Sequence, residues 1–113
     1  MKMIKTLLDK IKHFIRYNVA MIKYRYAVKL ADDAHKKSGE RYFVMPNEND
    51  KLIVINRNTF RKFKMRGQIV HEAAVKDMIK ESFYLTACKD ETHPVHPSVK
   101  EAKRLMYLEY VGL

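Results

Sequence analysis

The first 38 residues of this chain contain neither glycine nor proline, so no residue in them forces a break in a helix. In residues 1–16 the apolar side chains recur at helical spacing, while lysines and other polar residues occupy the opposite side. The apolar set is Ile4, Leu7, Leu8, Ile11, Phe14 and Ile15. We expect four of these to be buried, within the chain or against a second copy: Ile4, Leu8, Ile11 and Ile15.

Beyond Tyr17 the apolar stripe changes direction. A new sector, rotated by roughly a quarter turn, is defined by Val19, Ile22, Tyr26, Leu30 and Ala34. Two interpretations fit: two helices with Asn18 as an N-cap, or one long helix that meets different partners along its length. The C-terminal end is better defined, because Lys36 and Lys37 suit a last helical turn and Gly39 suits the left-handed position after it.

A β-hairpin is predicted over about residues 41–56. Residues 41–45 and 51–55 are rich in β-branched and aromatic side chains, and the intervening PNEND provides turn-forming residues. The run LIVI is apolar without alternation, which indicates that both faces of the second strand are covered. A hairpin alone is marginally stable, so we expect a third strand, and residues 83–87 (FYLTA) are the natural candidate.

Two more helices are predicted in the C-terminal half. In residues 71–82, one side collects Ala74, Val75, Met78, Ile79 and Ser82. In the last helix, Ser98 and Glu101 have the spacing of a capping box, and Gly112 is placed to end the helix. Its expected inner stripe is Val99, Ala102, Met106 and Tyr110. The chain is therefore predicted to form one α+β domain over residues 1–113, with residues 1–17 as a candidate helical arm.

Residues 57–67, RNTFRKFKMRG, carry five positive charges and no acidic residue. They are predicted to form a short helix capped by Asn58, anchored in the core by Phe60 and Phe63, and terminated by Gly67. Its basic side chains are the candidate nucleic-acid contacts: Arg57, Arg61, Lys62, Lys64 and Arg66. A helix face that is simply solvated accounts for the same charges equally well.

The net charge of +10 favours anionic partners. Residues 1–41 hold eleven basic and four acidic side chains, and residues 51–66 hold six basic and none acidic. From His71 onward the sequence contains six basic and seven acidic side chains. The positive charge therefore belongs to the N-terminal helical region and to the short basic helix.

Sequence-specific DNA recognition is disfavoured, because a helix-turn-helix would use residues 72–82 as its recognition helix and that segment is net negative.

Metal binding is disfavoured as well. Cys88, His93 and His96 lie close together, but their spacing matches no zinc motif, so we predict no metal and no cofactor. Because Cys88 is the single cysteine, no internal disulfide forms, and a cytoplasmic location is expected.

No glycine-rich phosphate loop or recognisable nucleophile pair is present, so we predict that the protein is not an enzyme. The preferred hypothesis is a small basic domain that contacts DNA or RNA through phosphates, without strong sequence preference. The alternative is a protein-interaction module or homo-oligomer that uses the N-terminal amphipathic helix. Peripheral membrane attachment is ranked below both, because the chain lacks tryptophan and a globular remainder follows the helix.

Overall fold

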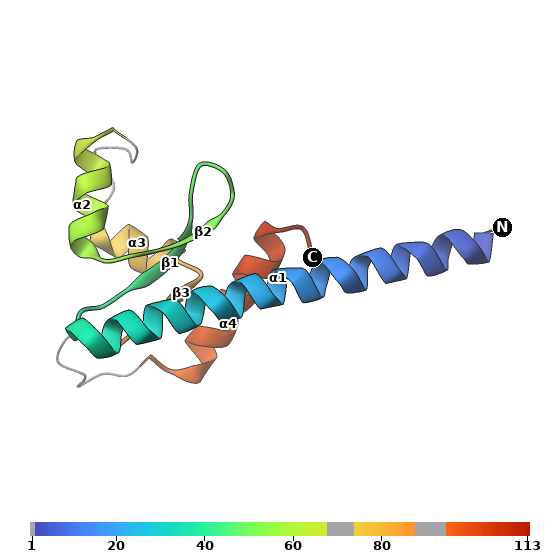
Figure 1. The fold of residues 1–113 in the computed structure, drawn as a ribbon, viewed down its shortest axis with the longest axis horizontal. Coiled ribbons are helices and arrows are strands. Elements are labelled where there is room, and N and C mark those ends of the chain that lie inside the picture. Colours follow the sequence, from blue (N-terminus) through green and yellow to red (C-terminus); the bar gives the residue numbers. More distant parts are fainter. Residues whose placement is uncertain (1, 68–73, 88–94) are drawn as a thin grey trace.

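The structure is a computed structural model that describes residues 2–67, 74–87 and 95–113. Within these ranges the elements are α1 (Lys2–Ser38), β1 (Phe43–Pro46), β2 (Leu52–Ile55), α2 (Arg57–Met65), α3 (Val75–Glu81), β3 (Tyr84–Leu85) and α4 (Pro97–Tyr110). The strands form an antiparallel sheet of order β2-β1-β3, and helices pack around it (Figure 1). The predicted α+β class is confirmed.

Helix α1 runs without a break, which decides between the two interpretations in favour of one long helix. Asn18 is not a cap. Its Nδ2 donates a hydrogen bond of 2.8 Å to the backbone oxygen of Phe14, one turn earlier in the same helix. The helix ends as predicted, because the backbone N–H of Gly39 donates to the oxygen of His35 and Gly39 has a φ of 73°.

Strand β1 lies at the centre of the sheet. Phe43 pairs with Ile55 of β2 on one side and with Leu85 of β3 on the other. The third strand was expected within residues 83–87, and the structure confirms it there in the short form Tyr84–Leu85. The hairpin turn is closed by Asn47, whose Oδ1 accepts hydrogen bonds of 2.9 Å from the backbone N–H groups of Asn49 and Lys51.

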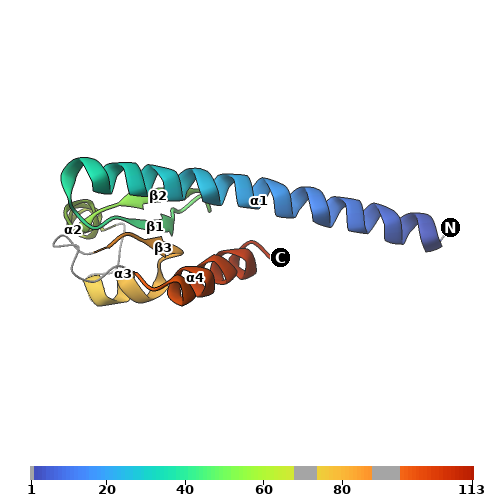
Figure 2. The same cartoon turned by 90° about the horizontal axis from the view of Figure 1, so that it is seen from below.

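Both faces of the sheet are covered, as the apolar run LIVI predicted. Leu52, Val54 and Val44 pack with the side chains of α1 and α4. Ile53 and Ile55 pack on the opposite side with the side chains of α2 and α3. Figure 2 shows α1 lying along one side of the molecule, with the sheet and the remaining helices beneath it.

The apolar sector predicted for the second half of α1 is present, but it is not the side of the helix that packs on the core. The side chains that face the sheet and α4 are Ala20, Met21, Tyr24, Ala27 and Ala31, all buried. Val19, Ile22, Tyr26 and Leu30 are exposed, and at 100° per residue they lie roughly half a turn away from the buried set. The physical reason is close packing: alanine side chains allow the helix backbone to approach the sheet, whereas larger aliphatic residues would hold it off.

The first part of α1 buries none of its described side chains, although a terminal nitrogen of Arg16 donates to the backbone oxygen of Val111 at 3.2 Å. Every described side chain from Lys5 to Val19 is exposed, including Leu8, Ile11 and Ile15. The expectation that these residues are buried within the chain is therefore wrong, and burial against another molecule stays untested. The side chain of Ile4 lies outside the described part of the structure.

The inner side of α4 also differs from the prediction. Val99, Met106 and Tyr110 are exposed, and the buried side chains are Lys103, Tyr107 and Leu108. Ring stacking fixes this orientation, because Tyr107 packs against Tyr24 of α1 with ring centroids 5.3 Å apart. The N-cap is His96, whose Nδ1 accepts from the backbone N–H of Ser98, so the predicted cap at Ser98 is wrong.

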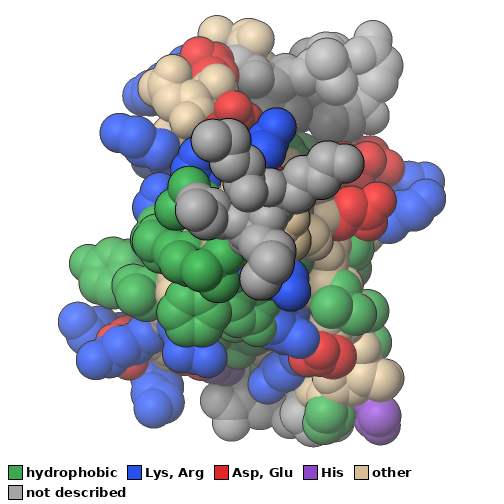
Figure 3. Space-filling view, turned by 90° about the vertical axis from the view of Figure 1, so that its right-hand side faces the viewer, with side chains coloured by type: hydrophobic (Ala, Val, Ile, Leu, Met, Phe, Trp, Pro, Cys, Tyr) green, Lys and Arg blue, Asp and Glu red, His purple; other side chains and the backbone are tan. Residues whose placement is uncertain are grey.

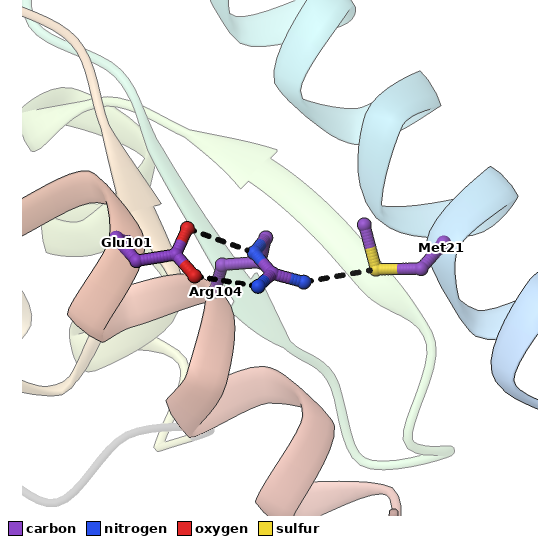
Figure 4. Close-up of polar contacts among 3 residues, drawn as sticks. All are labelled: Met21, Glu101 and Arg104. Carbon is purple, nitrogen blue, oxygen red and sulfur yellow. Dashed lines mark hydrogen bonds and ion pairs between the residues drawn. The ribbon is translucent and has the colours of Figure 1, made fainter. Parts of the chain in front are cut away.

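Glu101 does not complete a capping box, because its carboxylate binds Arg104 instead. The guanidinium donates from Nε at 3.0 Å and from a terminal nitrogen at 2.5 Å, and its other terminal nitrogen lies 3.8 Å from Sδ of Met21 (Figure 4). The hydrogen bond from Arg104 holds the pKa of Glu101 below its usual value. Arg104 thus connects α4 to the buried side of α1.

Candidate interaction surfaces

The basic helix α2 is fixed to the core by two aromatic side chains. Phe60 is 4% exposed, and Phe63 is half-buried against the same cluster, which also contains Met78. The prediction that both rings are core anchors is confirmed. The cap is Asn56, whose Oδ1 accepts from the backbone N–H of Thr59 at 2.9 Å, so the predicted cap at Asn58 is wrong by two positions.

The five predicted contact residues all lie on α2 or at its C-terminal cap. Arg57, Arg61, Lys62 and Arg66 are exposed, and Lys64 is half-buried. At 100° per residue they divide into two groups on opposite flanks: Arg57, Arg61 and Lys64 on one, Lys62 and Arg66 on the other. No straight line along α2 therefore passes all five cations, and each flank presents two or three of them.

The other basic segment does not extend this surface. The N-terminal half of α1 projects from one end of the molecule, and α2 stands at the other end (Figure 1). The two positively charged segments are therefore separate surfaces.

A cleft of about 270 Å³ opens beside the N-terminal end of α2, lined by Glu40, Arg41, Arg57 and neighbouring side chains. Two of these charged groups already serve the fold. The carboxylate of Glu40 accepts from Nδ2 of Asn56 at 3.0 Å, and Nε of Arg41 donates to the backbone oxygen of Thr86 at 3.0 Å. These two hydrogen bonds connect the segment that follows α1 to the N-cap of α2 and to the residue that follows β3. We assign no chemistry to the cleft.

A second surface, which the sequence interpretation did not recognise as one unit, runs along α1. We call it the α1 stripe, and it consists of large apolar side chains that are each 44–67% exposed: Leu7, Leu8, Ile11, Phe14, Ile15, Val19, Ile22, Tyr26 and Leu30. Several members repeat every eleven residues, which is close to three helical turns. The stripe spans about 35 Å of helix at 1.5 Å per residue. This eleven-residue spacing is the sequence feature from which the stripe could have been recognised as one surface.

Positive side chains border the α1 stripe. Lys5, Lys12, Arg16 and Lys23 follow one edge and Lys10 lies near the other edge, all exposed. Asp9 is the single acidic residue in residues 2–31, and it lies just outside the edge that carries Lys5 and Lys12, one helical turn from each. Figure 3, which looks along α1 from its N-terminal end, shows hydrophobic side chains gathered on one side with lysine and arginine side chains above and below them.

The described residues contain no group of three or more His, Cys, Asp or Glu side chains able to hold a metal ion. Cys88 and His93 lie outside the described residues, and His96 caps α4. Of the helices that the structure describes, none has the length and apolar character needed to cross a bilayer.

No protein-family model, no curated protein and no solved structure matches this chain significantly. We therefore infer function from the chemistry of the two surfaces.

Proposed function

We propose that this protein is a non-enzymatic cytoplasmic attachment module whose α1 stripe binds an apolar surface on another molecule. The observation that carries this proposal is the line of nine large apolar side chains on the side of α1 opposite the core. Contiguous exposed apolar patches on a folded protein mark interaction sites, since they are costly in water. The buried side of α1 is already filled, so the stripe is not needed to complete the described core.

The size of the stripe suits reversible attachment. Completing the burial of nine half-exposed aliphatic and aromatic side chains provides on the order of 10 kcal/mol of transfer free energy. Association costs of comparable size offset part of this. The result is a contact that forms and dissociates rather than a permanent assembly.

A fluorescent reporter tests the attachment function, because the chain contains no tryptophan. In the Ile11→Trp variant, uncharged dodecyl maltoside micelles are expected to shift the emission to shorter wavelength as the indole leaves water. The matched control is His13→Trp, which places the indole on the far side of the same helical turn and is expected to shift little. Equal shifts in the two variants, or no shift in Ile11→Trp with circular dichroism showing the helix intact, would contradict the proposal.

A second candidate function is phosphate contact by α2, since its basic side chains belong to a core-anchored helix and residues 51–66 of the sequence contain no acidic residue. With two or three contacts per strand, the log–log dependence of affinity on salt should have a slope of about −2 to −3. The binding is expected to be weak and indifferent to sequence.

Fluorescence anisotropy with duplex DNA, single-stranded DNA and RNA across a salt series tests this candidate. Replacing Arg61, Lys62 and Arg66 by glutamine should flatten the slope, whereas the matched triple Lys5→Gln, Lys12→Gln and Lys23→Gln on α1 should not. Absence of binding at low salt, with the protein folded, rules the candidate out and leaves α2 as a structural helix with a solvated face.

A further inference from the structure

We infer that the surface bound by the α1 stripe is an anionic lipid bilayer, on which α1 lies flat. This inference rests on the proposed attachment function and names its partner. The sheet, α2, α3 and α4 all lie on the opposite side of α1 (Figure 2), so a planar surface can reach the length of the stripe without meeting the body of the protein.

The charge at the edges of the stripe selects an anionic surface. Lysine and arginine side chains bury their aliphatic stems beside an apolar surface and keep their charged ends in the headgroup layer. Lys5, Lys12 and Lys23 are placed for this on one edge, and Lys10 on the other. Arg16 also lies on the first edge, but its guanidinium donates to the backbone oxygen of Val111. Cytoplasmic leaflets carry anionic lipids that attract such basic segments. An apolar face with basic borders is the composition of helices that lie in the membrane interface.

The same charges argue against a second copy of this chain as the partner that covers the α1 stripe. In an antiparallel pair of α1 stripes, the edge with Lys5, Lys12 and Lys23 would face the same edge of the other molecule. In a parallel pair it would face the edge that carries Lys10. Asp9, the single carboxylate in residues 2–31, lies beside the edge with Lys5 and Lys12, so cations outnumber carboxylates in both pairings and like charges still predominate.

The course of the stripe also suits a flat surface. Leu8, Val19 and Leu30 are spaced by eleven residues, and this spacing keeps them nearly aligned along α1, which is straight in both views (Figures 1 and 2). A left-handed coiled-coil partner requires a spacing of 3.5 residues instead. Within residues 7–22, Asn18 is the polar residue inside this sector, and its amide donates to the backbone oxygen of Phe14.

The depth of contact should vary along the helix. Arg25 and Lys29 fall within the same angular sector as the stripe near its C-terminal end. We therefore assign the deepest contact to residues 7–22, and place Tyr26 and Leu30 at the edge of the bilayer. Tyrosine suits this position, since its ring is apolar and its hydroxyl prefers water.

Vesicle cosedimentation with the full chain tests the inference, using vesicles of phosphatidylcholine alone or with added phosphatidylserine. We expect partitioning at least tenfold stronger onto the anionic vesicles, falling as salt is raised. The double variant Ile11→Asp and Ile15→Asp should lose binding. The triple variant Lys5→Gln, Lys12→Gln and Lys23→Gln should lose most of the preference for phosphatidylserine. The matched control, Arg61→Gln with Arg66→Gln on α2, should bind as the parent does.

The lipid assignment would be overturned if the protein did not partition onto vesicles with phosphatidylserine, or if it partitioned equally onto both vesicle compositions. The α2 control variant could also lose binding to the same extent as the α1 triple. That result would overturn the lipid assignment too, because the attraction would then depend on the net positive charge and not on the edges of the α1 stripe. After such a failure in the vesicle test, the attachment function would still stand if the Ile11→Trp emission shifts in uncharged micelles, or if the chain self-associates through the stripe in sedimentation equilibrium.

Discussion

Lys103 of α4 donates a hydrogen bond of 2.8 Å from Nζ to the backbone oxygen of Ser82, the residue that follows α3. The same ammonium group donates to the oxygen of Ile79 at 2.7 Å, although Lys103 is only 6% exposed. A cation suits the C-terminal end of a helix, where backbone oxygens lack partners and the helix dipole is negative. Burial lowers the pKa of Lys103, and these carbonyl contacts offset the cost of holding its charge there.

Removing this ammonium group should destabilise the fold. Lys103→Met keeps most of the aliphatic stem but leaves the oxygens of Ile79 and Ser82 without their donor, at a cost of about 2 kcal/mol. Urea denaturation measures the change in the free energy of unfolding. Lys100→Met is the control, because this lysine is exposed on the same helix. It loses a cation–π contact of 5.8 Å with the ring of Tyr84, so its effect should stay below about 1 kcal/mol. Similar losses in the two variants would show that the buried contacts contribute nothing.

The two sides of α1 should respond differently to a carboxylate. Ala27→Asp places an unpaired charge against the sheet, where Ala27 is 4% exposed, and should cost several kcal/mol. Ile11→Asp lies on the exposed stripe and should change the free energy of unfolding by less than about 1 kcal/mol. Thermal unfolding of both variants checks the orientation of the helix. A severe loss in Ile11→Asp would mean that the stripe is part of the core after all.

Asn56, rather than Asn58, should control the stability of α2. Asn56→Ala removes the acceptor for the backbone N–H of Thr59 and should cost about 1 kcal/mol. Asn58→Ala changes an exposed side chain within the helix and should be nearly neutral. The comparison uses chemical denaturation of the two variants under one condition. Reversed magnitudes would place the helix start at the position the sequence first suggested.

Tyr24 should make the stability depend on alkaline pH. Its hydroxyl donates to the backbone oxygen of Phe83 at 2.8 Å, and burial raises the pKa of Tyr24 from 10.0 to about 12. Below pH 10 both the folded and the unfolded chain keep this proton, so the contribution is fully present. As pH rises from 10 to about 12, the unfolded chain loses a proton that the folded chain retains, and stability falls.

Denaturation midpoints measured between pH 8 and pH 12 test this for the parent chain and Tyr24→Phe. The variant should be less stable by about 1 kcal/mol at pH 8, because the oxygen of Phe83 loses its donor. The difference should narrow above pH 10, where only the parent has Tyr24 to ionise. Tyr84 is present in both proteins, and its pKa is raised mainly by burial and by its hydrogen bond to Asp32, with Tyr24 as the last of the causes, so most of its effect cancels in the comparison. If the difference in stability between the parent and Tyr24→Phe stayed constant from pH 8 to pH 12, Tyr24 would not be the source of the alkaline pH dependence.

Local signals in the sequence determined most of the elements. Helical spacing without glycine or proline predicted α1, and its end at Gly39 follows from a left-handed backbone position that glycine adopts readily. The β-branched runs on either side of PNEND predicted the hairpin. Phe60 and Phe63 predicted which side of α2 is anchored. These features depend on neighbours within a few residues, which is the range over which a sequence pattern is informative.

The tertiary structure alone decided which side of each long helix is buried. A pattern ranks side chains by hydrophobicity, but packing selects by shape, so Ala27 and Ala31 face the sheet while Ile22 and Tyr26 remain exposed. Lys103 is buried because distant carbonyls offer it partners, which no local pattern records. The charges of both candidate surfaces are visible in the sequence. Only the fold separates α2 from the α1 stripe, because distance between surfaces depends on how α1 crosses the sheet.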